Sequence, residues 1–177
     1  MQRFVSRALL AGLLAAGAFG ATAADAPAPA TLTLTSTAFA DQAAMPVKYT
    51  CEGDNINPPL ALGKVPPAAV TLVLIVEDPD ATRGTWDHWV MWNLPPTTTE
   101  IKENSAPGTV GRNSGGKNRY QGPCPPTGTH RYIFRVYALN ARLDLPETAD
   151  KAQVLQAMAG KVLATGTLTG RYQRQAK

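Results

Sequence analysis

Alternation of polar and apolar residues predicts a β-strand just after residue 30 and another near the C-terminal end of the chain. Residues 31–36 read Thr-Leu-Thr-Leu-Thr-Ser, and residues 162–172 alternate in the same way. A period of two is typical of a strand with one buried face. Two shorter segments, 47–51 and 60–62, are also predicted strands, and the dense turn formers of residues 52–59 predict a loop between them.

The middle of the chain holds three strongly apolar segments. Residues 70–76 form a continuous and largely β-branched run, which predicts a strand covered on both faces. Residues 86–94, ended by Pro95-Pro96, and residues 131–139 are the other two. The two-residue period places the following residues on a common face in each strand: Trp86, His88, Val90 and Trp92 in one, and His130, Tyr132, Phe134 and Val136 in the other.

One helix is expected, over residues 148–159. Thr148 suits its N-cap, three apolar residues recur at helical spacing, and Gly160 can close it. Residues 97–121 are rich in Gly, Asn and Ser and predict a long loop, which in a compact domain is usually functional or mobile. Many short strands and one late helix indicate a mainly β protein, an antiparallel two-sheet β-sandwich with a short C-terminal helix.

Residues 1–23 have the features of a secretory signal peptide. Two arginines precede an apolar segment, residues 8–20, and residues 21–23 offer the small side chains of a cleavage site. The apolar segment is too short to span a bilayer stably, so a retained anchor is the weaker alternative and no stable membrane insertion is expected. We expect residues 24–30 to be a tether, residues 31–177 to be a single domain, and the mature protein to be periplasmic or secreted.

Charge limits the classes of partner. The 177-residue chain has 17 basic and 13 acidic side chains, and losing two arginines with the signal leaves 15 − 13 = +2. The remaining basic residues are scattered and lack the stripe that follows a nucleic-acid backbone, so no nucleic-acid partner is expected.

The chain has two cysteines, Cys51 and Cys124. In an oxidising compartment they could form a disulfide that closes a long loop, or they could be two buried free thiols. The sequence leaves both alternatives open, because the separation of the two Cα atoms decides between them.

Candidate chemistry centres on the two histidines, His88 and His130. Each is predicted on a strand beside a shaped loop: residues 78–80 (Asp-Pro-Asp) follow a buried strand, and the proline-rich residues 122–126 precede His130. Imidazole N–H groups, a tyrosine hydroxyl and backbone amides together suit a phosphate or carboxylate. The alternative is that each histidine is a half-buried strand residue bonded to a neighbouring carbonyl.

Three motifs together resemble the phosphatidylethanolamine-binding protein family, also called Raf kinase inhibitor-like. They are Asp78-Pro79-Asp80, Trp86-Asp87-His88-Trp89 and the segment from Gly122 to Tyr132, in the family's order and spacing. Residues 51–60 and 168–172 resemble its bacterial branch, and the similarity spans roughly residues 32 to 174.

The resemblance implies a sandwich with Greek-key connections and an anion pocket at one end, where the family binds phospholipid headgroups, nucleotides or phosphorylated side chains. His88 and His130 would donate to phosphate oxygens, Tyr132 would add a hydroxyl, and Asp78 would orient a histidine or meet an ammonium group. The implied ligand-binding residues are Asp78, Asp80, Trp86, His88, Gly122, Cys124, Pro125, Pro126, His130 and Tyr132.

Two departures from the family pattern stand out. The aspartate loop continues with Ala81-Thr82 where the family usually has Ala-Pro, so no proline fixes the turn beside Asp80. Little sequence follows Tyr172, where some eukaryotic relatives have a C-terminal helix that gates the pocket. A kinase-inhibitor role therefore carries over poorly.

These features predict a non-catalytic binding protein for small phosphorylated or anionic ligands, without a cofactor. The alternative is a protein-interaction module that modulates an envelope or host enzyme through residues 97–121, with a vestigial pocket. An enzyme is third, since Cys124 and His130 could pair as nucleophile and base but no orienting carboxylate is evident. A metal site is not indicated, because the sequence has no closely spaced pair of ligand residues such as His-x-x-x-His. A homodimer is compatible with the resemblance to bacterial relatives.

Overall fold

The computed structural model describes residues 30–175, which form two β-sheets and one α-helix. The predicted signal peptide and all but the last residue of the predicted tether lie outside the described residues. The elements in chain order are β1 (Ala30–Thr31), β2 (Thr33–Thr35), the 3₁₀-helix η1 (Val47–Tyr49), β3 (Leu60–Gly63), β4 (Thr71–Asp78), β5 (Trp86–Leu94), β6 (Glu100–Ile101), β7 (Thr109–Val110), β8 (Thr129–Leu139), α1 (Lys151–Met158) and β9 (Val162–Gln173).

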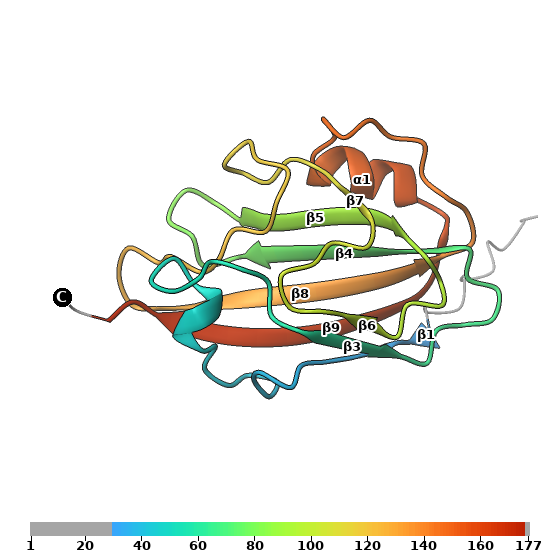
Figure 1. Ribbon diagram of the computed structural model, residues 1–177. Coiled ribbons are helices and arrows are strands. Elements are labelled where there is room, and N and C mark those ends of the chain that lie inside the picture. Colours follow the sequence, from blue (N-terminus) through green and yellow to red (C-terminus); the bar gives the residue numbers. More distant parts are fainter. Residues whose placement is uncertain (1–29, 176–177) are drawn as a thin grey trace, which may run out of the picture.

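The larger sheet has the strand order β1-β9-β8-β4-β5-β7, and the smaller has the order β2-β3-β6. Figure 1 shows β5, β4, β8 and β9 running side by side. β8 follows β7 in the chain but returns to pair with β4, on the edge opposite β5, which is the long returning connection expected of a Greek-key sandwich. The predicted mainly β, two-sheet fold with one late helix is confirmed.

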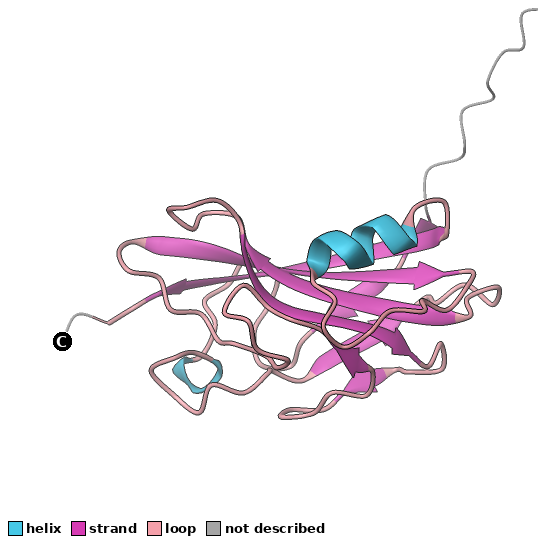
Figure 2. Ribbon diagram, turned by 90° about the horizontal axis from the view of Figure 1, so that it is seen from above, coloured by secondary structure: helices cyan, strands magenta, loops and turns pink. Residues whose placement is uncertain are grey.

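Two apolar clusters cover the two faces of the larger sheet. Alternate residues of β4, such as Leu72 and Leu74, pack toward the smaller sheet, while Val73 and Ile75 pack toward α1. Figure 2 shows α1 lying against the sheet. All but one of the eight residues of β4 are buried, so the prediction of a strand covered on both faces is confirmed.

The predicted strand over residues 31–36 is divided between the two sheets. β1 pairs with β9 in parallel, and β2 pairs antiparallel with β3. Leu32, between them, donates its N–H to the Thr165 carbonyl at 2.7 Å. Gly166 makes this approach possible, because a Cβ there would lie 2.7 Å from the Leu32 oxygen.

The prediction of a strand over residues 47–51 is wrong. This segment curls into η1. The Lys48 carbonyl accepts from the N–H groups of Asp54 and Asn55 in the same loop, not from a neighbouring strand. Gly53 packs so closely that a Cβ would lie 2.3 Å from the Val47 oxygen. The tight packing of this loop on itself removes the hydrogen bonds that a strand needs. Residues 97–121, predicted as loop throughout, also contain the two-residue strands β6 and β7.

The N-cap of α1 is Asp150, and the prediction that Thr148 caps the helix is wrong. The Asp150 side chain accepts from the Gln153 N–H at 3.0 Å, and the Gln153 side chain accepts from the Asp150 N–H at 3.1 Å. This reciprocal capping box satisfies N–H groups at the helix start that have no partner within the helix. The helix ends at Met158, and Gly160, the residue predicted to close it, follows with φ +71°.

The cap makes a direct test. Asp150→Ala should lower the free energy of unfolding by about 1 kcal/mol, because an N-cap acceptor is lost. Thr148→Ala is the matched control and should change it by less than about 0.5 kcal/mol, as expected for an exposed side chain without such a role. Urea unfolding of both variants provides the measurement. Equal destabilisation by the two substitutions would contradict the assigned cap.

Candidate anion pocket

His88 occupies a β-bulge in β5. Val76 of β4 pairs with Trp89, and the next residue, Glu77, pairs with Asp87, so His88 has no residue opposite it. An extra residue of this kind bends the strand and redirects its side chain, and it occurs often beside functional sites.

The bulge places the His88 ring against Tyr132. The two rings meet edge to face, with centroids 5.1 Å apart and an angle of 80° between their planes. Tyr132 belongs to the cluster between the sheets, whereas Val90 and Trp92 pack in the cluster with α1. The predicted common face of His88 with Val90 and Trp92 is therefore wrong, because simple alternation takes no account of a bulge.

The backbone of Gln121 fixes the His88 ring. His88 Nδ1 lies 2.6 Å from the Gln121 carbonyl oxygen, and the Gln121 N–H donates to the His88 carbonyl at 3.0 Å. A carbonyl only accepts, so Nδ1 carries the hydrogen and Nε2 bears the lone pair of the neutral ring. Burial lowers the pKa of His88, although the Gln121 carbonyl and the charge of Asp78 act against this shift.

Asp78 holds the second imidazole. His130 Nδ1 lies 2.7 Å from Asp78 Oδ2, and both side chains are buried. The other oxygen of Asp78 accepts the N–H of Asp80 at 2.8 Å. The carboxylate is thus held at the end of β4 and orients the ring at the start of β8. As in His88, Nε2 is the ring nitrogen without a hydrogen-bond partner in the described chain.

The Tyr132 hydroxyl is buried beside the Asp78 carboxylate and the Cys124 backbone. Burial and the charge of Asp78 raise the pKa of Tyr132, so the hydroxyl keeps its proton. Tyr132 therefore packs behind the two histidines and Asp78 and does not itself line the cavity.

A cavity of about 510 Å³ opens where these side chains meet. Seven of the predicted ligand-binding residues line it, and Asp80, Gly122 and Tyr132 do not. The predicted residues in the wall are Asp78, Trp86, His88, Cys124, Pro125, Pro126 and His130.

Asp80 is engaged outside the cavity. Its Oδ2 accepts from the backbone N–H and the Nε–H of Arg131, both at 2.9 Å, and its Oδ1 accepts from Arg131 Nη2 at 2.7 Å. The guanidinium lowers the pKa of Asp80 to about 2. Asp80 therefore clamps the loop after β4 to the start of β8.

Gly122 positions the proline-rich loop and does not line the cavity. Its N–H donates to Asn55 Oδ1 at 2.7 Å. A Cβ at this position would lie 2.5 Å from the Tyr49 carbonyl oxygen, so only glycine permits the approach.

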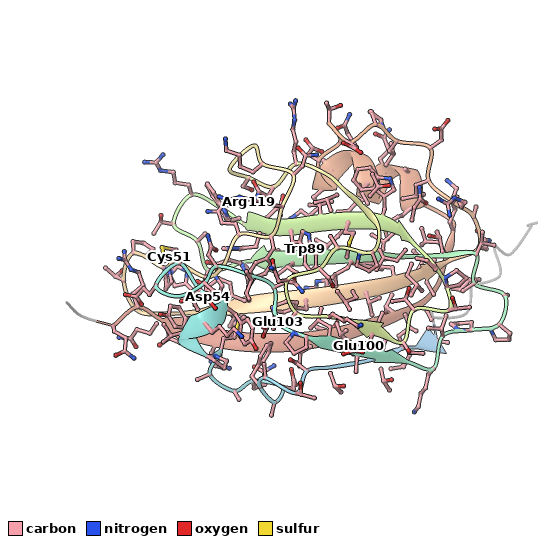
Figure 3. The ribbon with its side chains drawn as sticks, viewed as in Figure 1. Cys51, Asp54, Trp89, Glu100, Glu103 and Arg119 are labelled. Atoms are coloured by element: carbon pink, nitrogen blue, oxygen red, sulfur yellow. A yellow bond between two sulfur atoms is a disulfide. The ribbon has the colours of Figure 1, made fainter. Side chains whose placement is uncertain are left out.

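A disulfide between Cys51 and Cys124 ties the same loop to residues near η1 (Figure 3). The Cα atoms are 5.4 Å apart, and the Cys51 N–H donates to the Pro123 carbonyl at 3.0 Å. Of the two alternatives that the sequence left open, the structure has the disulfide. It fixes a wall of the cavity to a distant part of the chain.

Other lining residues have no counterpart in the sequence prediction. Arg83 is exposed, lies three residues before Trp86 in the turn after β4, and forms no ion pair in the part of the chain described. Gln121 fixes His88 through its backbone carbonyl, so its side-chain chemistry offers no signal. The remaining unpredicted lining residues are Ala81, Thr82, Gly84, Thr85 and Ser114.

The chemistry of the cavity favours an anion. Two imidazoles and the Arg83 guanidinium can face a ligand, and the Asp78 carboxylate is directed at His130. Within residues 30–175, no three His, Cys, Asp or Glu side chains gather as a metal site would require. The cavity is thus suited to phosphate, sulfate or carboxylate groups.

Comparisons with known proteins place this chain in one class. The model of the family described as "Phosphatidylethanolamine-binding protein" matches residues 35–173. A UPF0098 protein of Methanothermobacter thermautotrophicus is 48% identical over 144 residues, covering 77% of this chain and 95% of that protein.

Two solved structures are also similar. A phosphatidylethanolamine-binding protein homolog from Chlamydia trachomatis has a TM-score of 0.80 and 41% identity, covering 82% of this chain and 99% of that one. Escherichia coli YbcL, titled a new member of the mammalian family, has a TM-score of 0.76 and 27% identity over 82% of this chain and 100% of its own. The chain belongs to the phosphatidylethanolamine-binding protein family.

Loss of the disulfide should destabilise the protein. In the chain-entropy model, a closed loop of 73 residues stabilises the folded state by roughly 4 kcal/mol, which sets an upper estimate. Cys51→Ala/Cys124→Ala should therefore unfold at lower urea concentration than the oxidised protein and should not respond to a reductant. An unchanged midpoint would contradict this account of the loop.

Proposed function

We propose that this protein is a non-catalytic binding protein with a small pocket for phosphate-bearing ligands, such as phospholipid headgroups or phosphorylated groups. The observation that carries the proposal is the arrangement of the two histidines. Both line one cavity, and the protein occupies Nδ1 of each ring, leaving Nε2 for a ligand.

The two rings need not act alike. In neutral His88 the Nε2 lone pair accepts, so it can meet the O–H of a singly protonated phosphate. Once protonated, the same nitrogen donates to a phosphate oxygen. In His130, Nδ1 is engaged by Asp78 at 2.7 Å, so Nε2 is the nitrogen left for the ligand. Arg83 lines the same cavity and adds donors.

A catalytic role has less support. Cys124 is joined to Cys51 and provides no thiolate, which removes the nucleophile of the cysteine–histidine alternative. The Asp78 carboxylate accepts a hydrogen bond from Nδ1 of His130. Among the described residues, no nucleophilic side chain bonds to the other nitrogen of this ring. A site of this composition binds and orients an anion.

We place the mature protein in the periplasm or outside the cell. A disulfide at the surface persists in an oxidising compartment and is rare in the cytosol. The N-terminal sequence has the pattern of a cleaved export signal. No helix in residues 30–175 has the length and apolar character needed to cross a bilayer.

Titration with phosphoethanolamine tests the pocket. Imidazole NMR signals of both His88 and His130 should shift with the same saturation curve, and His130→Gln should weaken binding about tenfold or more through loss of a charge-assisted hydrogen bond. Arg112→Gln, an exposed arginine outside the cavity, is the control for net charge. If neither histidine signal responds at millimolar ligand, the anion pocket fails and a protein-interaction role through residues 97–121 gains.

Sulfate binding should strengthen as the pH falls from neutral toward mildly acidic. Burial lowers the pKa of free His88 relative to an exposed imidazole, and a bound anion favours protonation of the ring. Uptake of one proton raises affinity by at most about tenfold per pH unit. Sulfate keeps its charge across this range, so calorimetry reports on the protein. His88→Gln should reduce the pH dependence, and an affinity that is flat or falls on acidification would contradict the role of His88.

A further inference from the structure

A second cavity, of about 340 Å³, shares no lining residue with the anion pocket. Three separate loops form its walls, and Trp89 of β5 contributes the remaining side (Figure 3 labels Asp54, Trp89 and Arg119). The lining residues that carry the argument are Asp54, Ile56, Trp89, Asn104, Val110 and Arg119.

Buried or bound amide side chains hold these walls in place. Asn57 donates to the Lys102 carbonyl at 2.9 Å and accepts the Ser105 N–H at 3.0 Å, which joins two of the loops. Asn118 donates to the Val110 carbonyl at 2.8 Å and so ties the third loop to β7. The cavity is therefore pre-formed, and its shape does not depend on a ligand.

Opposite charges line this cavity without pairing with each other. Asp54 and Arg119 are both exposed, and neither forms an ion pair in residues 30–175. The backbone of Arg119 is fixed by the Asn113 side chain, which donates to its carbonyl at 3.0 Å. Two charges that line the same cavity without pairing can both be met by a ligand that carries a cation and an anion.

Trp89 forms a rigid side of the cavity. Its indole Nε1 is buried and has no hydrogen-bond partner in the described chain. The ring is fixed by Tyr120, which meets it edge to face with centroids 5.7 Å apart. A buried N–H without an acceptor is uncommon, and its NMR signal is a sensitive probe of this side of the cavity.

We propose that this cavity binds a small zwitterion, a free amino acid or a short peptide. Asp54 takes the ammonium group, and Arg119 takes the carboxylate, while the buried Trp89 ring forms one side of the site. Ile56 and Val110 pack against an apolar side chain, and the Asn104 amide, which forms no side-chain hydrogen bond in the described chain, adds polar contact. This site goes beyond the proposed anion-binding function and does not depend on it.

The three tryptophans of the chain lie in three different places, so each can report on binding at its own place. Trp86 lines the anion pocket, Trp89 lines the second cavity, and Trp92 is buried in the cluster with α1. Indole ¹H–¹⁵N signals of the mature protein, assigned with single Trp→Phe variants, therefore report on each place separately. On titration with L-leucine or leucylglycine, the Trp89 signal should shift and saturate at millimolar ligand, while the Trp86 and Trp92 signals stay in place.

The charge requirement is tested with modified ligands. N-acetyl-L-leucine lacks the ammonium group and L-leucinamide lacks the carboxylate, and each should bind about tenfold or more weakly than L-leucine. Asp54→Asn and Arg119→Gln should each weaken L-leucine binding to a similar extent. Lys117→Gln, an exposed residue of the same loop that does not line the cavity, is the control.

Three outcomes would overturn the proposal. The first is a Trp89 signal that responds to neither L-leucine nor leucylglycine. The second is binding of the blocked ligands as strong as that of L-leucine. The third is a Trp89 shift with inorganic phosphate that matches the shift with L-leucine, since this would mark a second anion site. A failed phosphoethanolamine titration at the histidines would leave this test unaffected.

Discussion

Two imidazole rings are buried at one end of the larger sheet, and each is held through its Nδ1 atom. Burial of a polar ring is costly unless its N–H finds a partner, and here the partners are the Asp78 carboxylate and the Gln121 carbonyl. This requirement fixes both tautomer and orientation. It directs Nε2 of His88 and of His130 to one cavity, on which the proposed function depends.

Much of the surrounding structure supports these two bonds. The bulge in β5 brings His88 to the ring of Tyr132, and β8 carries Tyr132 and His130 in one strand. The Gln121 carbonyl is held by the adjoining loop, where Gly122 contacts the backbone near η1 and the disulfide follows two residues later. A substitution at any of these supports would shift a ring nitrogen, although the substituted residue does not contact the ring.

The sequence was sufficient for the strands that have periodic patterns and for the residues that recur as motifs. It was insufficient where backbone geometry decides. A bulge at His88 and the exchange of sheets at Leu32 leave no mark in a two-residue period. Asp80 is a carboxylate in a motif of ligand residues, but it forms an ion pair with Arg131 outside the cavity. The second cavity collects side chains from distant loops, and only the fold brings Trp89 and Arg119 to one cavity.

The central claim is that the protein occupies Nδ1 of both rings and leaves Nε2 to the ligand. Long-range ¹H–¹⁵N correlation of the histidine side chains tests it most directly, since it distinguishes the two nitrogens of each ring. We predict that neutral His88 is protonated at Nδ1, and that addition of phosphate mainly changes the Nε2 shifts of His88 and His130. A neutral His88 protonated at Nε2, or a response confined to Nδ1, would contradict the account.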